Sequence, residues 1–588
     1  MCGIAGIVNK KDVEANEKKL SSMLNTLNKR GPDDKGSVLF NSGCALGQTR
    51  LSIIDIASGK QPMRDNSKPI TITFNGEIYN YRELRRNLER QGYQFSTNSD
   101  TEVILKSYIE YGYDCLKYLD GMFAFGIWND EKKELFLARD RFGEKPLFYT
   151  QHEGSFYFAS EIKALLETGV DKDLDNSAIN DFLTLLYVPP WKTIYKCIHT
   201  IKPAHYAVYK NDILTETKYW EIKKNDDFKN ITTDEVVDVV RDMLSDSVKS
   251  RMVADVEVGS FLSGGIDSSL VTTLASKISE KPLKTFSAGF EDFINELPFA
   301  EKVAKLNKTD HYSQQMKFDL LSAFRSVSTY FDSPFADSSN VPMFIISKFA
   351  REKVKVALSG DGGDELFWGY GQYTKHKRLP KFRKLKQKLF SDPFTDYCMD
   401  IQHFKLKERL SLMKDKNSVR DDFKDHVDLS EARSDLEKIN LMDFYMGLPG
   451  DMLTKVDRSS MMNSLEVRAP FLNHKLAEFA FNLPEELKVK ELKGKYILKE
   501  AFKDIVLSEI FDRKKQGFGS PIDSWLKKDE FKKYVYGEIM EKEPLMSQYL
   551  NTKEIRDIFQ KFYNGDANQK YKAWALLSFE EWLKTRIK

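Results

Sequence analysis

The chain has 588 residues, of which 41% are hydrophobic and 30% are charged, and its formal net charge is +2 at pH 7. At ~100–200 residues per domain it is long enough for several domains, and the near-neutral charge gives no support to nucleic acid or a membrane surface as the main partner. No stretch approaches the ~18 consecutive apolar residues of a membrane span. Five scattered cysteines argue against a disulfide framework or a structural zinc site. We therefore expect a cytoplasmic protein with reduced thiols that binds neither nucleic acid nor membranes.

The first part of the chain, residues 1–220, is predicted to be rich in antiparallel strands. Short β-branched and aromatic runs recur between turn signals, and ITITF (70–74) alternates with a period of two. Amphipathic helices are expected near 81–91 and 100–111. This mixture indicates an α+β domain.

A second domain is predicted over 231–588, after the polar and aperiodic linker KKNDDFKN (223–230). Thr232 and Glu235 have the spacing of a capping box, which predicts a helix start. Short strands then alternate with helices, as expected for a parallel α/β sheet. Beyond about residue 430 the pattern is mainly helical.

The segment SGGIDSS (263–269) follows a predicted strand and precedes a predicted helix. Gly264 and Gly265 let a ligand approach backbone N–H groups, and the serine hydroxyls stand at a helix N-terminus, where anions are favoured. Asp267 would face phosphate only through a cation, so Mg²⁺ is implied. The pattern G-x-x-x-x-G-K-[ST] is missing, so the segment favours a pyrophosphate loop of the ATP pyrophosphatase type over γ-phosphate transfer. A plain glycine turn is the alternative.

The segment VKVALSGDGGDELF (354–367) has the same construction of strand, glycine loop and helix start. Ligands of an open parallel sheet bind outside the carboxyl ends of its strands. The two loops could therefore share one nucleotide and its metal ions, with Asp364 as the second Mg²⁺ ligand beside Asp267.

Cys2 directly follows the initiator methionine. An adenylate needs a nucleophile, and glutamine hydrolysis through a thioester would supply ammonia. With Met1 removed, the α-amine of Cys2, whose pKa would be ~7.7–8.0, could take the thiol proton. A lone cysteine is usually a small buried hydrophobic residue, but its position and the adenylating loop together favour a nucleophile.

Several motifs resemble a known family. MCGIAGI (1–7), RGPDD (30–34), NGEIYNY (75–81) and RDRFGEKPLFY (139–149) resemble a class II glutamine amidotransferase domain. SGGIDSS, LSGDGGDELFWGY (358–370), KVDRSSMMNSLEVRAPFL (455–472) and RKKQGF (513–518) resemble the synthetase domain of glutamine-hydrolysing asparagine synthetases. The resemblance implies an N-terminal-nucleophile αββα sandwich, followed by a doubly wound α/β domain of the ATP-pyrophosphatase type with a helical C-terminal cap.

The resemblance also implies a reaction. Glutamine would be hydrolysed at Cys2, and ammonia would pass through an internal tunnel lined by both domains to a β-aspartyl-AMP made from ATP and L-aspartate. The products would be L-asparagine, AMP and pyrophosphate, and a homodimer is a further expectation.

Residue roles follow from the matching positions. Asn75 and Gly76 would form the oxyanion hole, and Arg50 would clamp the glutamine carboxylate. The implied glutamine-binding residues are Arg50, Leu51, Ile53, Asn75, Glu77 and Asp100. The implied ATP-binding residues are Leu262, Ser263, Gly264, Gly265, Asp267, Ser268, Ser269, Ser287, Ser359 and Gly360. Asp267 and Asp364 would bind Mg²⁺. Asp361 would act near the acceptor carboxylate, and Lys515 would neutralise charge as pyrophosphate leaves.

Some positions depart from the family pattern. Asp361 stands where Glu is frequent, Trp368 where Gly is common and Asn473 where Asp is usual, and KTDHYSQQ (308–315) lacks an H-H-E sequence. These departures bear on the acceptor more than on ATP. Amidation of another carboxylate, such as a sugar uronate or a peptide precursor, and a catalytically silent regulatory protein therefore stay as alternatives.

Overall fold

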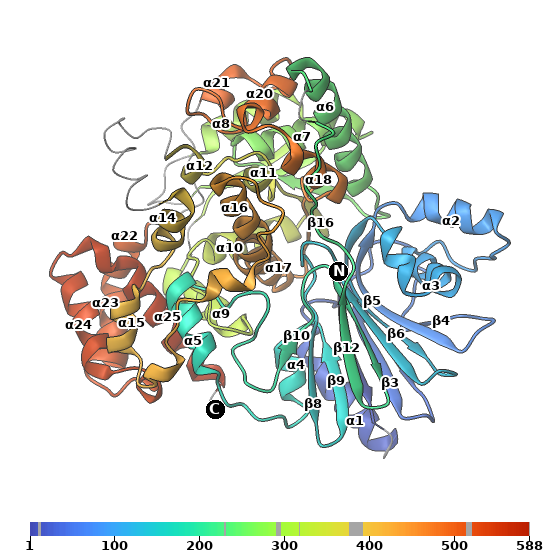
Figure 1. The fold of residues 1–588 in the computed structure, drawn as a ribbon, viewed down its shortest axis with the longest axis horizontal. Coiled ribbons are helices and arrows are strands. Elements are labelled where there is room, and N and C mark those ends of the chain that lie inside the picture. Colours follow the sequence, from blue (N-terminus) through green and yellow to red (C-terminus); the bar gives the residue numbers. More distant parts are fainter. Residues whose placement is uncertain are drawn as a thin grey trace.

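The computed structural model describes residues 1–9, 13–228, 231–289, 296–316, 318–375, 392–512 and 520–586. Within these ranges the chain forms two antiparallel sheets, then a parallel sheet surrounded by helices, then a helical lobe (Figure 1). No helix of the described ranges combines the length and the apolar character that crossing a membrane requires.

The two antiparallel sheets lie face to face, and helices cover their outer faces. The first has the strand order β10–β8–β9–β1–β3–β2, with bounds β1 (Cys2–Val8), β2 (Asp34–Leu39), β3 (Cys44–Arg50), β8 (Phe148–His152), β9 (Ser155–Ala159) and β10 (His199–Thr200). The second has the order β12–β11–β7–β6–β5–β4, with bounds β4 (Met63–Arg64), β5 (Ile70–Ile78), β6 (Gly121–Asn129), β7 (Glu134–Arg139), β11 (His205–Lys210) and β12 (Ile213–Lys218). The covering helices are α1 (Val13–Thr26) and α4 (Ile162–Leu166) on the first sheet, and α2 (Tyr81–Arg90) and α3 (Asp100–Tyr111) on the second.

Strand β1 shows why these layers form. Its side chains alternate between the two faces of the sheet, because successive residues of a strand point in opposite directions. Ala5 and Ile7 pack under α1, whereas Ile4 and Val8 enter the core between the sheets. Every residue of β1 is therefore buried. The expected αββα sandwich and both expected helices, now α2 and α3, are confirmed.

The second region contains the predicted parallel sheet. Its order is β15–β14–β13–β16–β17, with bounds β13 (Val258–Phe261), β14 (Lys284–Gly289), β15 (Asp310–Gln315), β16 (Val356–Leu358) and β17 (Glu466–Arg468). The chain order reverses direction between β13 and β16, so the crevice for a ligand lies at the carboxyl ends of these two strands. The predicted capping box is present: Thr232 and Glu235 bond reciprocally at the start of α6 (Thr233–Arg251).

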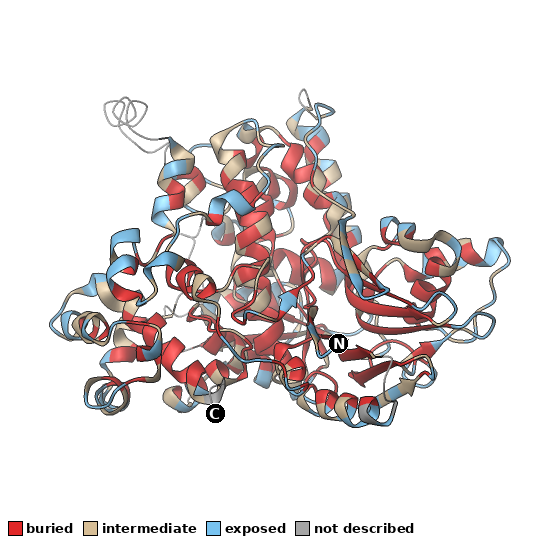
Figure 2. Cartoon of the chain, turned by 60° about the horizontal axis from the view of Figure 1, so that its bottom comes forward, coloured by how far each residue is buried: buried red, intermediate tan, exposed pale blue. Residues whose placement is uncertain are grey.

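Helices make up most of the remaining chain. They are α5 (Asn176–Leu185), α7 (Ile266–Ile278), α8 (Leu297–Leu306), α9 (Leu320–Tyr330), α10 (Asn340–Arg351), α11 (Gly363–Leu366), α12 (Gln372–Lys375), α14 (Pro393–Asp400), α15 (Leu406–Leu412), α16 (Asp435–Met442), α17 (Leu453–Met461), α18 (His474–Asn482), α19 (Glu485–Lys488), α20 (Tyr496–Phe502), α21 (Ser508–Asp512), α22 (Ile522–Lys527), α23 (Asp529–Val535), α24 (Thr552–Tyr563) and α25 (Lys570–Arg586). Helices α22 to α25 gather in a lobe beside α5 and α15 (Figure 1). Buried residues, red in Figure 2, concentrate where the antiparallel sheets meet the second region.

The sequence pattern missed strand β17. The segment beyond residue 430 was expected to be helical, yet Glu466, Val467 and Arg468 pair in parallel with β16. Two charged residues in so short a segment do not indicate a buried strand. Glu466 and Arg468 are nevertheless fully buried. Their charges are balanced by groups of the first region, which no local pattern reveals.

Candidate functional sites

Cys2 lies at the start of β1, directly opposite Arg50 at the end of β3. Its backbone N–H donates to Asn75 Oδ1 over 2.9 Å, and its side chain is buried. Burial raises the pKa of the Cys2 thiol, while the terminal amine, the Leu51 N–H and Arg50 oppose that rise. Groups that favour a thiolate thus lie around Cys2, but burial outweighs them and the thiol pKa is raised overall.

Arg50 is held by the loop that follows β3. Its guanidinium donates to the carbonyl oxygens of Ile54, Asp55 and Ile56 over 3.0, 2.8 and 3.2 Å. A Cβ at Gly59 would lie 2.7 Å from Arg50 Nη2, so glycine there gives the guanidinium its space. Arg50 is therefore fixed without a carboxylate partner among these contacts, as a clamp for a substrate carboxylate requires.

Asn75 and Gly76 lie near the end of β5, next to Cys2. Asn75 Nδ2 is buried and makes no hydrogen bond to any described residue. Gly76 has φ +154°, and a Cβ there would overlap the Met122 carbonyl oxygen. This geometry leaves an amide donor beside the thiol for an oxyanion.

Glu77 and Asp100 are buried carboxylates beside this donor. The Ile78 N–H donates to Asp100 Oδ2 over 3.1 Å, and burial raises the pKa of Asp100 to about 6. Burial also raises the pKa of Glu77 well above its usual value. Paired buried carboxylates suit an ammonium ligand.

Leu51 and Ile53 contribute through their backbones. The Leu51 N–H donates to the Met1 carbonyl over 3.0 Å, and the Ile53 carbonyl accepts the Asp255 N–H over 2.9 Å. Their side chains enter the core under the second sheet. The Ile53 carbonyl thus binds the second region.

The second candidate site lies at the ends of β13 and β16. Within SGGIDSS, Ser263 Oγ and Ser268 Oγ are 3.0 Å apart, and the Gly265 N–H donates to Ser263 Oγ over 3.2 Å. Cβ atoms at Gly360 and Gly363 would lie 2.8 Å from Asp267 Cβ and 2.6 Å from Asp267 Oδ1. The structure thus brings both predicted loops into direct contact.

Asp267 and Asp364 share one lysine that the sequence did not suggest. Lys495 Nζ lies 2.6 Å from Asp364 Oδ1 and also pairs with Asp267. Burial alone would lower the pKa of Lys495, but the two carboxylates outweigh it and raise that pKa. Lys495 has a left-handed backbone at the N-cap of α20. The sequence around Lys495 does not predict this conformation, so no local pattern points to this lysine.

The other expected ATP residues surround the same crevice. Ser287 Oγ donates to the Leu262 carbonyl, and the Ser359 N–H donates to the Arg468 carbonyl over 2.9 Å. The Oγ atoms of Ser269 and Ser359 are buried without a hydrogen bond to described residues. The Cβ of an alanine at Gly264 would lie 2.6 Å from Phe299 Cβ. Lys515 lies outside the described residues.

The donor set fits Mg²⁺. Mg²⁺ is usually held by one or two carboxylates together with substrate phosphates, and Asp267 and Asp364 supply two carboxylates at one point. The described residues contain no cluster of three or more His, Cys, Asp or Glu that could hold a metal ion. The site therefore suits an ion bound largely by phosphate oxygens.

A charged cluster lies beside Asp361. Lys455 Nζ is 3.5 Å from Asp337 Oδ2, and burial, which would lower the pKa of Lys455, is outweighed by Asp337, Asp451 and Asp361. Burial and Asp337 raise the pKa of Asp451 well above its usual value. The cluster offers both signs of charge next to the SGDGG loop, and the sequence analysis did not identify it.

The structure shows the contacts of two residues that depart from the family pattern, Trp368 and Asn473. Trp368 is buried and stacks on Tyr373, with ring centroids 4.9 Å apart. Asn473 caps α18, and its Nδ2 donates to Asp120 Oδ2 over 3.0 Å. Asn473 thus joins the two regions.

A small cavity is lined by residues of both regions. Its volume is about 10 Å³, and Met1, Ser359 and Asp361 contribute to its lining. About one water molecule fits in such a space. Met1 also packs in a buried apolar cluster with Tyr79, Met122 and Met461.

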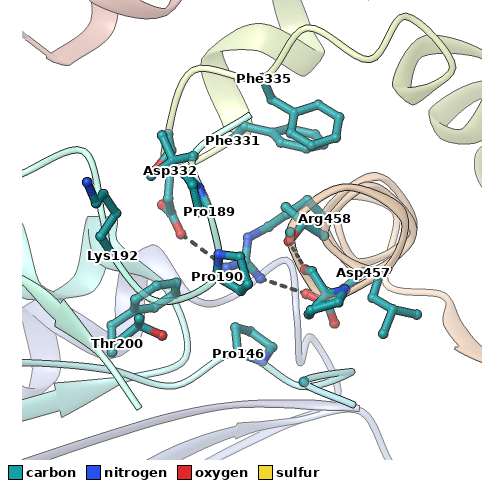
Figure 3. A pocket seen from close by; sticks show the side chains of 18 of the residues that line it. Pro146, Pro189, Pro190, Lys192, Thr200, Phe331, Asp332, Phe335, Asp457 and Arg458 are labelled. Carbon is teal, nitrogen blue, oxygen red and sulfur yellow. Dashed lines mark hydrogen bonds and ion pairs between the residues drawn. The ribbon is translucent and has the colours of Figure 1, made fainter. Parts of the chain in front are cut away.

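A larger cavity, of about 70 Å³, lies beside it at the boundary of the two regions (Figure 3). The two cavities share Glu144, Leu453 and Asp457 in their walls. Arg458 extends between Asp457 and Asp332, at 2.7 and 3.7 Å (Figure 3). Asp332 also accepts the Ile162 N–H over 2.9 Å, so this charged cluster contacts the first region.

Arg30 joins the two regions. Its guanidinium donates to both oxygens of Asp457, over 2.8 and 2.9 Å, and to Glu161 Oε1 over 3.0 Å. All three side chains are buried. A bidentate pair of this kind specifies orientation as well as contact, so it fixes how the two sites face each other.

The fold and these sites define an N-terminal-nucleophile amidotransferase joined to a nucleotide-binding α/β domain. A family model described as asparagine synthase matches residues 239–584, and one described as a glutamine amidotransferase domain matches residues 1–220. The chain belongs to the asparagine synthase family.

Named relatives agree with this assignment. "Asparagine synthetase [glutamine-hydrolyzing] 1" of Bacillus subtilis is 35% identical over a 617-residue alignment that covers 99% of this chain and 96% of the relative. "Asparagine synthetase [glutamine-hydrolyzing] 3" of the same organism is 34% identical and covers 88% of this chain and 87% of the relative. "Amidase chry2" of Gibberella zeae is 27% identical and covers 89% of this chain and 90% of the relative.

Proposed function

We propose that this protein is a glutamine-dependent asparagine synthetase, with the glutaminase in residues 1–220 and the synthetase in residues 231–588. The observation that carries the proposal is the small cavity between the two sites, whose lining includes Ser359 and Asp361 on the nucleotide side and, on the other, Met1, the residue that precedes Cys2 and leaves on maturation. The residue next to the thiol and the loop next to the nucleotide crevice thus face one space. Ammonia released at one site could reach the other without entering bulk water.

In the first half-reaction, removal of Met1 frees the Cys2 amine, which takes the thiol proton. The thiolate attacks the glutamine amide carbon, and Asn75 Nδ2 and the Gly76 N–H stabilise the oxyanion. Ammonia leaves, and water hydrolyses the thioester to glutamate. Arg50 would hold the substrate carboxylate, and Asp100 would hold its ammonium.

In the second half-reaction, the acceptor carboxylate attacks the α-phosphorus of ATP, and pyrophosphate leaves. Mg²⁺ on Asp267 and Asp364 would neutralise the phosphate charge. Lys495 would remain beside the same phosphates, and Lys515 would add charge as expected from the family motif. Ammonia then attacks the acyl-adenylate, which gives the amide and AMP.

The acceptor we propose is L-aspartate. An amino acid needs a cation for its α-carboxylate and an anion for its α-ammonium. Lys455, with Asp337 and Asp451, offers both beside Asp361. A sugar uronate has no ammonium group that could pair with these carboxylates.

The test uses variants of the full chain. Cys2→Ala should abolish glutamate release from glutamine and keep amide synthesis from ammonia, and Cys197→Ala is the matched control because Cys197 lies outside both sites. Products should be AMP and pyrophosphate. Glutamine hydrolysis by Cys2→Ala, or ADP as a product, would contradict the proposal.

A second candidate is amidation of another carboxylate, which the departures from the family pattern at Asp361 and Trp368 leave open. A panel of acids with ATP and ammonia separates the two. Pyrophosphate release with a sugar acid or a peptide, and none with millimolar aspartate, would select the second candidate. The silent regulatory alternative is opposed by the presence of Cys2, Arg50 and both carboxylates of the crevice.

We also propose a cytoplasmic location and a homodimer, from the composition and the family resemblance. Analytical ultracentrifugation of the purified chain tests the second of these.

A further inference from the structure

Strand β17 of the synthetase region carries two charged side chains against the glutamine site. Glu466 and Arg468 alternate with Val467, so both point to the same face of the strand. Both are fully buried, and Arg468 Nε donates to Glu466 Oε1 over 2.6 Å. A buried charged pair at a boundary needs partners on the other side.

Those partners belong to the first region. Arg468 Nη2 lies 3.4 Å from Glu77 Oε1 and makes no hydrogen bond to a described residue. Glu466 Oε2 lies 2.9 Å from the terminal amine of Met1. Removal of Met1 moves the terminal amine to Cys2, whose nitrogen lies 2.9 Å from Asn75 Oδ1, and leaves Glu466 and Glu77 both facing Arg468.

The charge balance around Glu77 depends on this arginine. The ionisable groups that face Glu77 are Glu466 and Arg468 on β17, Asp100 on α3 and the terminal amine. Burial and Glu466 raise the pKa of Glu77, whereas Arg468 lowers it. A protonated Glu77 could not pair with a substrate ammonium, so glutamine binding requires a cation behind it.

We propose that Arg468 is a positioning residue for glutamine, which it serves by placing its positive charge against the Glu77 carboxylate and orienting it. The inference rests on the proposed function in one respect, that glutamine is the ligand. It assigns a task in the glutaminase site to a residue of the synthetase region.

The same residue touches the nucleotide crevice. Its carbonyl oxygen accepts the Ser359 N–H over 2.9 Å, and Leu358 is its partner in the sheet. A shift of the SGDGG loop on nucleotide binding would therefore move the residue that holds Glu77. Occupancy of the ATP site should change the KM for glutamine.

The experiment compares Arg468→Gln, Arg468→Lys and the exposed control Arg433→Gln in the full chain. Arg468→Gln should raise the KM for glutamine about tenfold at pH 7, the effect of moving one pKa by about one unit. The acid limb of kcat/KM for glutamine should move to higher pH. Ammonia-dependent synthesis should change far less, and Arg468→Lys should restore part of the affinity because it keeps the charge.

An unchanged KM and pH profile in folded Arg468→Gln would overturn the proposal. If Arg468→Gln does not fold, Glu466→Gln serves as the second test. Loss of the negative charge beside Glu77 should move the acid limb of kcat/KM for glutamine to lower pH. No shift, or a shift to higher pH, would overturn the proposal. An unmodified chain that releases no glutamate would instead refute the proposed function.

Discussion

Replacement of Lys495 by methionine should destabilise the Mg²⁺-free protein and raise its affinity for Mg²⁺. The lysine side chain is 6% exposed and pairs with Asp267 and Asp364, which are 17% and 21% exposed. Methionine keeps most of the length and loses the charge. The two carboxylates would then face each other without a cation, and removal of one partner from a buried ion pair costs about 3–5 kcal/mol.

Mg²⁺ can replace the missing charge. A ligand at about 100 times its Kd stabilises the folded state by about 2.7 kcal/mol, so saturating Mg²⁺ should restore much of the loss. In the unmodified protein, Lys495 and Mg²⁺ compete for the same oxygens. Mg²⁺ alone should therefore stabilise the unmodified protein less than the variant.

Thermal unfolding with and without MgCl₂ measures both effects, and titration calorimetry gives the affinities. Lys503→Met is the matched control, because Lys503 is 69% exposed and pairs only locally with Glu500. If Lys495→Met unfolds at the temperature of the unmodified chain, or if Mg²⁺ stabilises both equally, the shared-lysine reasoning is wrong.

Three other predictions concern the glutamine site and its connection to the synthetase. Gly76→Ala should lower the rate of glutamine hydrolysis about 10²–10³-fold through loss of an oxyanion donor, because the alanine Cβ would overlap the Met122 carbonyl. Gly537→Ala, at a position with open space, is the control. Equal hydrolysis rates in the two variants would contradict this role of Gly76. The kcat/KM for glutamine should fall as pH drops through about 6, since protonated Asp100 cannot pair with the substrate ammonium and Arg468 opposes the protonation of Asp100 as well as that of Glu77; a limb near pH 6 that persists in Asp100→Asn would assign it to Glu77 alone. Met461→Trp should fill the space beside Met461 that Met1 vacates. Because ammonia would then be hindered on its way to the synthetase, the ratio of glutamate to amide product should rise above one. An unchanged ratio would show that ammonia takes another route.

Local patterns in the sequence predicted those elements whose signals lie within a few residues. The alternation of ITITF predicted β5, and the spacing of Thr232 and Glu235 predicted the start of α6. The two glycine loops were recognisable because a turn between strand and helix requires glycine at defined positions. Cys2 was recognisable because its chemistry depends on its place in the chain.

Tertiary structure alone decided which distant groups meet. Asp267 and Lys495 are 228 residues apart in sequence, and Arg30 and Asp457 are 427 apart. Glu466 and Arg468 on β17 lack any local feature that distinguishes them from surface charges. A buried charge is tolerated only where a partner of opposite sign neutralises it, and the packing of the two regions determines that partner. The positions of Lys495 and Arg468 therefore follow from the fold, because the pattern around each residue describes only its nearest neighbours.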